Sequence, residues 1–218
     1  MDLPHRSCRK GLYPISNFPY VLGSESAGVI AGLPTDAAVL NDPEYQKRGY
    51  KEGARVAVVR PILMSCYADS TIHNTMQQSS GGHAEYMSIP WKNVHPVPDT
   101  VSTRTAAAVL LQGLTATSFT EEAYNVQKGD VILIHTVAGG LGLLLSQIAK
   151  SRGATVIGTT STEEKATLAR QNGADHVIIY KQENTVQRVL EITNGEGVHA
   201  VFDGVGKDTY VPNYGSYP

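Results

Sequence analysis

From residue 130 onward, short apolar runs alternate with segments that have a helical pattern. The apolar runs cover residues 130–137, 154–160, 175–180 and 197–206, and the helical segments cover residues 139–153, 161–173 and 184–195. Alternation of strands with helices of this length is typical of βαβ units, which build a parallel sheet. Because the crossovers are right-handed, the helices cover both faces of that sheet. The sequence therefore predicts an α/β fold with a doubly wound parallel sheet of about four strands.

Local signals predict where these helices begin and end. Ser161, with Glu164 three residues later, has the spacing of a capping box, so we expect Ser161 to be the N-cap of the second helix. Gly153 and Gly173 follow the first and second helices, at the position where a glycine commonly ends a helix. A further helical segment, residues 104–126, precedes the first strand.

The first hundred residues differ in composition and pattern, because they contain most of the prolines and show no long helical period. Three segments, residues 19–32, 53–59 and 81–90, are expected to form short strands of an irregular β unit. Two long polar loops, residues 33–53 and 65–81, connect them, and loops of this length are usually functional or poorly ordered. We therefore expect two domains, residues 1–103 and 104–218.

Composition narrows the classes of function. The formal net charge is −2, whereas nucleic-acid and anionic membrane surfaces require a cationic field. No apolar stretch approaches the roughly 18 residues of a membrane helix, and the first residues lack the apolar core of a secretory signal. The two cysteines, Cys8 and Cys66, are too few for a disulfide framework or a four-thiolate metal site. The expected class is a cytoplasmic protein without membrane or nucleic-acid partners.

A glycine-rich turn lies between the first strand and the first helix of the alternating region. Gly139, Gly140 and Gly142 stand there, although Val137 occupies the place of the first glycine in the G-x-G-x-x-G pattern. Glycines at such a turn let backbone N–H groups approach a pyrophosphate at the N-terminus of a helix. The alternative is that these glycines only let the helix pack closely on the strand.

The end of the second strand predicts which dinucleotide would bind. An NAD enzyme places Asp or Glu there for the ribose 2′-hydroxyl, but the first acidic residue is Glu163, inside the next helix. Hydroxyl groups at residues 159–161 and the cation of Lys165 suit a 2′-phosphate instead. The pattern therefore favours NADPH, with Thr159, Ser161 and Lys165 near the phosphate; alternatively, Lys165 belongs to a solvated helix face.

Residues 9–30, 81–86, 110–165, 171–178 and 201–209 together resemble the quinone oxidoreductase (zeta-crystallin) branch of the medium-chain dehydrogenase/reductase superfamily, and its fungal members most. The resemblance implies a GroES-like β domain before a Rossmann domain. It also implies hydride transfer from NADPH to a quinone or a conjugated enone without zinc. Ser24 agrees with this, because zinc-dependent relatives carry histidine at that position. His83 is then a structural residue, and no metal site is expected.

The resemblance also implies roles for individual residues. The implied and pattern-based cofactor contacts are Thr115, Ala138, Gly139, Gly140, Leu141, Gly142, Thr159, Ser161, Lys165 and Tyr180. Residues 138–142 would hold the pyrophosphate, Lys165 and Tyr180 the 2′-phosphate, and Thr115 would lie near the nicotinamide. Alternatively, Tyr180 is an ordinary aromatic residue at a strand end, and Thr115 is a helix threonine bonded to its own backbone.

No catalytic residue is assigned, because the Asn and Tyr that line the family's pocket have no counterpart, and Ser7 stands at the tyrosine position. Compared with the family, the chain is expected to be truncated at both ends, leaving an incomplete Rossmann sheet and an incomplete GroES-like domain. The family's homodimer is then not expected. Two other functions remain open: an enoyl-thioester reductase, and a non-catalytic NADPH-binding product.

Overall fold

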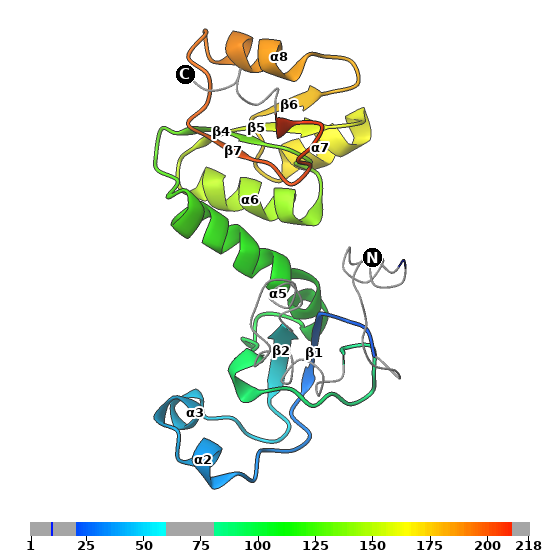
Figure 1. Cartoon of the computed structure of the whole chain (residues 1–218), viewed down its shortest axis with the longest axis vertical. Coiled ribbons are helices and arrows are strands. Elements are labelled where there is room, and N and C mark those ends of the chain that lie inside the picture. Colours follow the sequence, from blue (N-terminus) through cyan, green and yellow to red (C-terminus); the bar gives the residue numbers. More distant parts are fainter. Residues whose placement is uncertain (1–9, 11–20, 60–80, 211–218) are drawn as a thin grey trace. The chain divides into compact units, whose positions relative to one another are not determined.

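The computed structural model describes residues 10, 21–59 and 81–210. The chain divides into two compact units, Met1–Leu111 and Gln112–Pro218, and each is described by itself. The division falls inside helix α5 (Thr103–Ser118), drawn in green in Figure 1. The expectations for Ser7, Cys8 and Cys66, and for residues 65–80 of the second loop, lie outside the described residues.

The first unit contains an antiparallel sheet of three strands, β1 (Glu25–Val29), β2 (Arg55–Val59) and β3 (Val94–Pro96), with β2 in the middle. Successive residues of β2 face opposite sides, as in any strand. Val56 and Val58 pack with Val94 in one apolar cluster, whereas Ala57 packs in another cluster with Val97 and Ala106. The sheet is thus buried on both faces by small or β-branched side chains.

Two expectations for this unit are wrong. Residues 81–90 do not form a strand, because the backbone of Gly81 and Gly82 is bonded to Val21 and Gly23, and Gly23 has a left-handed φ of 109°. The third strand is instead β3, after the short 3-10 helix η2 (Trp91–Asn93). The segment 33–53 is not simply a loop, because it contains helices α2 (Ala37–Leu40) and α3 (Pro43–Arg48).

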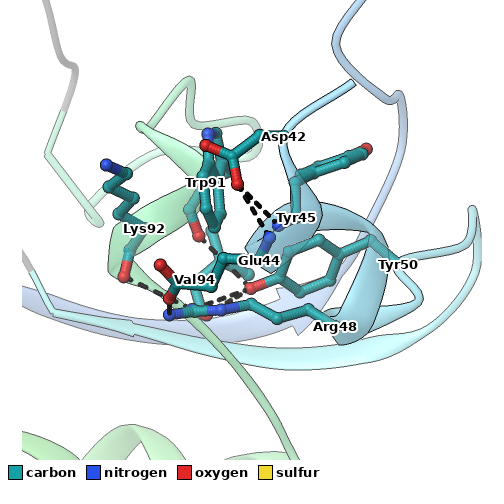
Figure 2. A network of polar contacts seen from close by, with 8 residues as sticks. All are labelled: Asp42, Glu44, Tyr45, Arg48, Tyr50, Trp91, Lys92 and Val94. Carbon is teal, nitrogen blue, oxygen red and sulfur yellow. Dashed lines mark hydrogen bonds and ion pairs between the residues drawn. The ribbon is translucent and has the colours of Figure 1, made fainter. Parts of the chain in front are cut away.

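The α2–α3 segment is fixed to the η2–β3 region by a polar and aromatic network, which Figure 2 shows. The guanidinium of Arg48 donates hydrogen bonds to the hydroxyl of Tyr50 (3.1 Å) and to the carbonyl of Val94 (3.0 Å). The Tyr50 hydroxyl donates to the Val94 carbonyl at 2.6 Å. Tyr45 is buried edge-on against Trp91, with 5.5 Å between ring centroids. These contacts give the segment a defined conformation.

The second unit holds the predicted alternation. Its elements are η3 (the π-helical turn Phe119–Ala123), β4 (Val131–Ile134), α6 (Gly140–Ser151), β5 (Thr155–Thr160), α7 (Glu163–Gln171), β6 (His176–Ile179), α8 (Thr185–Ile192) and β7 (Ala200–Phe202). The four strands form one parallel sheet in the order β6-β5-β4-β7. The predicted parallel sheet of four strands is confirmed.

Side chains that alternate along β4 divide the core of this unit into two layers. Ile132 and Ile134 belong to a cluster with Leu145 of α6, whereas Leu133 packs with Val189 of α8 on the other face. All five are at most 3% exposed. Figure 1 shows α6 and α8 on opposite sides of this sheet. The doubly wound arrangement is therefore confirmed.

The helix ends are partly as expected. Gly153 and Gly173 follow α6 and α7 with left-handed φ values of 86° and 105°. The predicted N-cap at Ser161 is wrong, because Thr162 is the N-cap of α7 and its hydroxyl accepts a hydrogen bond from the Lys165 amide. Thr162 has extended backbone angles that aim its hydroxyl at the first turn.

The order of the strands creates a topological switch point. The chain runs from β4 outward to β5 and β6, and then returns to the other side of β4 as β7. In open α/β sheets, ligands bind outside the carboxyl ends of the strands at such a point. The predicted glycine turn follows β4 at this edge.

Candidate functional site

Helix α6 begins at Gly140 with Gly139 as its N-cap, and glycine has no side chain that could cap the helix. The helices α2, α3, α7 and α8 are instead capped by the side chains of Asp36, Asp42, Thr162 and Asn184. Gly139 and Gly140 are both exposed. The first N–H groups of a helix and its dipole attract anions. The start of α6 is therefore suited to a phosphate group.

The glycines of the turn have separate roles. A Cβ at Gly142 would lie 2.6 Å from the carbonyl oxygen of Thr136 and 2.7 Å from Cα of Val137, so this glycine lets α6 pack against the turn. A Cβ at Gly140 would meet only the flexible end of Gln112, whose Oε1 lies 1.9 Å from that position. A Cβ at Gly139 would lie 3.1 Å from the Thr136 carbonyl oxygen.

Val137 replaces the first glycine of the usual pattern, and β5 provides the space for it. Val137 is completely buried. A Cβ at Gly158 of β5 would lie 2.5 Å from the Val137 side chain. The missing glycine of the turn is thus matched by a glycine in the neighbouring strand.

Thr136 is the strained residue of the turn. Its φ is 53°, in the left-handed region that β-branched residues rarely adopt. Its carbonyl accepts a hydrogen bond from the Gly139 amide (2.8 Å), and its hydroxyl donates to the His135 carbonyl (2.7 Å). Strained backbone of this kind gathers at functional sites. His135 and Val137, on either side of Thr136, are hydrogen-bonded to Thr159 of β5.

His135 lies beneath the turn and is only 6% exposed. Its Nδ1 is 2.9 Å from the hydroxyl oxygen of Thr159, and its amide donates to the carbonyl of Phe202. Thr159 is 2% exposed. His135 was not among the predicted site residues, although a histidine directly after an apolar strand is an available signal.

Asp203 follows β7 at the same edge of the sheet. Its carboxylate accepts hydrogen bonds from the amides of Val205 and Gly206 and from the hydroxyl of Thr209. Burial raises the pKa of this carboxyl, but those hydrogen bonds and the electrostatic influence of His135 outweigh burial, so the pKa of Asp203 is lowered. The carboxylate is thus kept ionised, and it orders the loop after β7.

A second group of predicted residues follows β5 and β6. The ammonium of Lys165 lies 3.5 Å from the hydroxyl oxygen of Ser161. The amide of Tyr180 donates to the carbonyl of Thr160, so Tyr180 lies at the same edge, and the residue is 51% exposed. The structure thus brings Ser161, Lys165 and Tyr180 to the carboxyl ends of neighbouring strands, on the side of the sheet away from β7.

Thr159 and Thr115 are placed differently from this group. The Thr159 side chain points into the protein, toward His135, rather than to the surface. Thr115 is half-buried in α5, about one helical turn after Gln112, the residue that contacts Gly140. Ala138 and Leu141 are half-buried and pack against the apolar cluster that includes α6.

Within residues 21–59 and 81–210, no three His, Cys, Asp or Glu side chains gather in a way that could hold a metal ion. No helix in the same part of the chain is both long and apolar enough to cross a membrane.

Two family models match the chain. The model of the alcohol dehydrogenase GroES-like domain matches residues 1–99, and that of the zinc-binding dehydrogenases matches residues 140–216. They correspond to the antiparallel sheet of the first unit and to most of the parallel sheet of the second.

Curated relatives and solved structures agree with these matches. A quinone oxidoreductase of Pseudomonas aeruginosa is 37% identical over 93% of this chain and 54% of its own length. A 2-haloacrylate reductase of Burkholderia is 47% identical over 47% of this chain and 31% of its own length. The crystal structure of Escherichia coli quinone oxidoreductase complexed with NADPH covers 100% of this chain and 59% of its own, at 30% identity and a TM-score of 0.80. The chain spans about half the length of the curated relatives it matches.

Proposed function

We propose that this chain, which belongs to the quinone oxidoreductase branch of the medium-chain dehydrogenase/reductase superfamily, binds NADPH and takes part in hydride transfer to a quinone. The name of the Pseudomonas aeruginosa relative supports the reaction, and the NADPH in the Escherichia coli structure supports the cofactor. Since the chain spans about half of such relatives, the proposal concerns first the step that the described residues can carry out, the binding of the cofactor.

The observation that carries the proposal is the open start of α6. Gly139 and Gly140 are exposed at the carboxyl end of β4, and the N-cap glycine has no side chain to cap the helix. A diphosphate supplies the acceptor oxygens that the first amides of a helix require. Lys165 follows β5, the strand next to β4, and Tyr180 follows β6, the next strand outward, at the same edge of the sheet. This arrangement fits a dinucleotide that extends from β4 toward β6.

The residues would divide the work of binding as follows. The amides of residues 139–142 hold the diphosphate. The ammonium of Lys165 and the hydroxyl of Ser161 attract a 2′-phosphate, and the exposed ring of Tyr180 covers it. Thr115 orients the nicotinamide end. When bound, NADPH supplies the hydride, and the protein's contribution is binding, orientation and electrostatics.

A second acceptor class, a carbon–carbon double bond conjugated to a carbonyl, is favoured by one comparison. The relative that is 47% identical over 103 residues is named for the reduction of 2-haloacrylate, an activated alkene. Hydride addition to such an alkene uses the same cofactor and the same binding edge. Turnover assays with a quinone and with an activated alkene distinguish the two acceptors.

The test is a fluorescence titration of the full chain with NADPH and, in parallel, NADH. We expect saturable binding of NADPH at least about tenfold tighter than that of NADH, a difference of about 1.4 kcal/mol. In Lys165→Met this preference should fall. In Lys128→Met, which removes an exposed lysine just before β4, it should not change.

Each contrary outcome has a defined meaning. Equal affinity for the two cofactors contradicts the 2′-phosphate assignment. The absence of binding to either contradicts the proposed function. Saturable binding without turnover of a quinone or an alkene supports a non-catalytic NADPH-binding protein.

A further inference from the structure

We infer that Gly158 and Thr159 of β5 are positioning residues that hold the phosphate turn in shape through Val137 and His135, and that Thr159 does not contact the 2′-phosphate. The inference rests on the proposed function, because it concerns the turn that would hold the diphosphate. It gives Thr159 a different task from that expected from the sequence. It also assigns tasks to three residues that the sequence pattern did not include among the cofactor contacts.

Thr159 holds the turn at two points. Its hydroxyl oxygen lies 2.9 Å from Nδ1 of His135, and its carbonyl accepts a hydrogen bond from the Val137 amide at 3.0 Å. Thr159 and His135 are only 2% and 6% exposed, so water competes little for the hydrogen bond between their side chains. One strand residue thus fixes the residues before and after Thr136.

Gly158 holds the turn by shape. The Val137 side chain is completely buried and fills the space above Gly158, where a Cβ would come within 2.5 to 2.6 Å of three Val137 atoms. Such contacts cannot be made without displacing the turn, because the Val137 side chain has no flexible end that could move aside. The absence of a side chain at residue 158 is therefore required by the valine at residue 137.

Thr136 transmits these contacts to the phosphate site. It lies between the two anchored residues with a φ of 53°, and its carbonyl accepts the Gly139 amide at 2.8 Å. A strained residue persists only where its surroundings enforce the conformation. Releasing His135 or Val137 lets Thr136 return to an ordinary backbone conformation, and Gly139, the N-cap of α6, then moves with it.

The buried position of Thr159 also distinguishes its role from that of the residues expected to contact the 2′-phosphate. Ser161 and Lys165, two and six residues further along, lie nearer the surface, and Lys165 is exposed. A 2′-phosphate can reach their side chains without entering the protein. Loss of the Thr159 hydroxyl should therefore weaken NADPH and NADH equally, whereas loss of a 2′-phosphate contact weakens NADPH alone.

The experiment compares three variants of the full chain by titration with NADPH and NADH, after thermal unfolding has shown that each is folded. Thr159→Val should bind both cofactors about tenfold more weakly, with their ratio unchanged. Thr159→Ser keeps the hydroxyl and should restore binding to within about twofold of wild type. Thr155→Val makes the same change at the amino end of the same strand and should leave both affinities unchanged.

A second pair of variants tests the inference without Thr159. Gly158→Ala should weaken both cofactors, and combination with Val137→Gly, which removes Cβ and both methyl groups of Val137, the three atoms in contact, should recover most of the loss. This rescue is not expected of a glycine whose loss merely destabilises the strand.

The outcomes separate the inference from the proposed function. Unchanged affinities in Thr159→Val, or a loss confined to NADPH, overturn the inference while wild-type binding upholds the function. Failure of Val137→Gly to rescue Gly158→Ala also overturns it. If wild type binds neither cofactor, the proposed function fails, and the inference fails with it.

Discussion

Replacement of Gly142 by alanine should destabilise the second unit, because its neighbours are backbone atoms. The new Cβ would lie 2.6 Å from the Thr136 carbonyl oxygen, where an ordinary contact needs at least 3.4 Å, so the atoms must separate by about 0.8 Å. Overpacking of this kind typically costs about 1–3 kcal/mol. Alanine recovers up to about 1 kcal/mol through its higher helix propensity.

The net effect should be a loss of about 1–2 kcal/mol in the free energy of unfolding. For a chain of this size that corresponds to a fall in melting temperature of about 2–8 °C. Thermal unfolding followed by circular dichroism measures this change. The matched control is Gly140→Ala, whose Cβ meets only the movable end of the Gln112 side chain, so its melting temperature should stay close to that of wild type.

Two results would refute this reasoning. A Gly142→Ala protein as stable as wild type would mean that the turn can move away from α6 without loss. An equal fall in Gly140→Ala would mean that helix-start glycines matter for a reason other than contact with the turn.

Two further predictions concern stability. The Asp175 carboxylate contacts the Lys150 ammonium and accepts the Val156 amide; burial raises its pKa, but these hydrogen bonds outweigh burial, so the pKa is lowered. The stabilisation is thus present above the unfolded pKa of about 3.9 and lost as pH falls through the folded pKa. Asp175→Asn should flatten the acid side of a stability–pH curve, and an unchanged curve contradicts this. Tyr50→Phe should lower stability by about 1 kcal/mol and speed proteolysis within residues 33–53, because it removes the hydroxyl that donates to Val94; unchanged cleavage would show that the α2–α3 segment is held by its aromatic contacts.

The parallel sheet could be predicted from the sequence because its signals are local and strong. In β4, every residue is apolar, and both faces of the strand are buried. A continuous apolar run of this kind is typical of a strand in a parallel sheet, so it predicts that arrangement. Gly153 and Gly173 mark helix ends through their own backbone preference. The N-cap of α7 could not be predicted in the same way, because Ser161 and Thr162 carry equivalent hydroxyls and only the backbone angles make Thr162 the cap.

The rest depended on contacts between distant segments. Residues 81–90 have the composition of a strand, yet the amides of Gly81 and Gly82 donate hydrogen bonds to Val21 and Gly23. Gly23 lies nearly sixty residues earlier in the chain and has a left-handed φ. Thr136, with its left-handed φ, likewise lies between His135 and Val137, which are both hydrogen-bonded to Thr159 of β5. The glycine turn itself was visible in the sequence, but the pairing of Val137 with Gly158, which replaces a glycine of the usual pattern, is visible only in three dimensions.

Under the proposed function, the start of α6 links the amount of folded protein to the concentration of its ligand. Because the N-cap of the helix is a glycine, which has no capping side chain, its first amides are open to an anion. A ligand that binds the folded chain but not the unfolded chain adds about 2.7 kcal/mol of stability at one hundred times its dissociation constant. Under the proposed function, the lifetime of this chain in the presence of proteases would therefore increase with the concentration of NADPH. Its abundance would then rise and fall with the supply of the reduced cofactor.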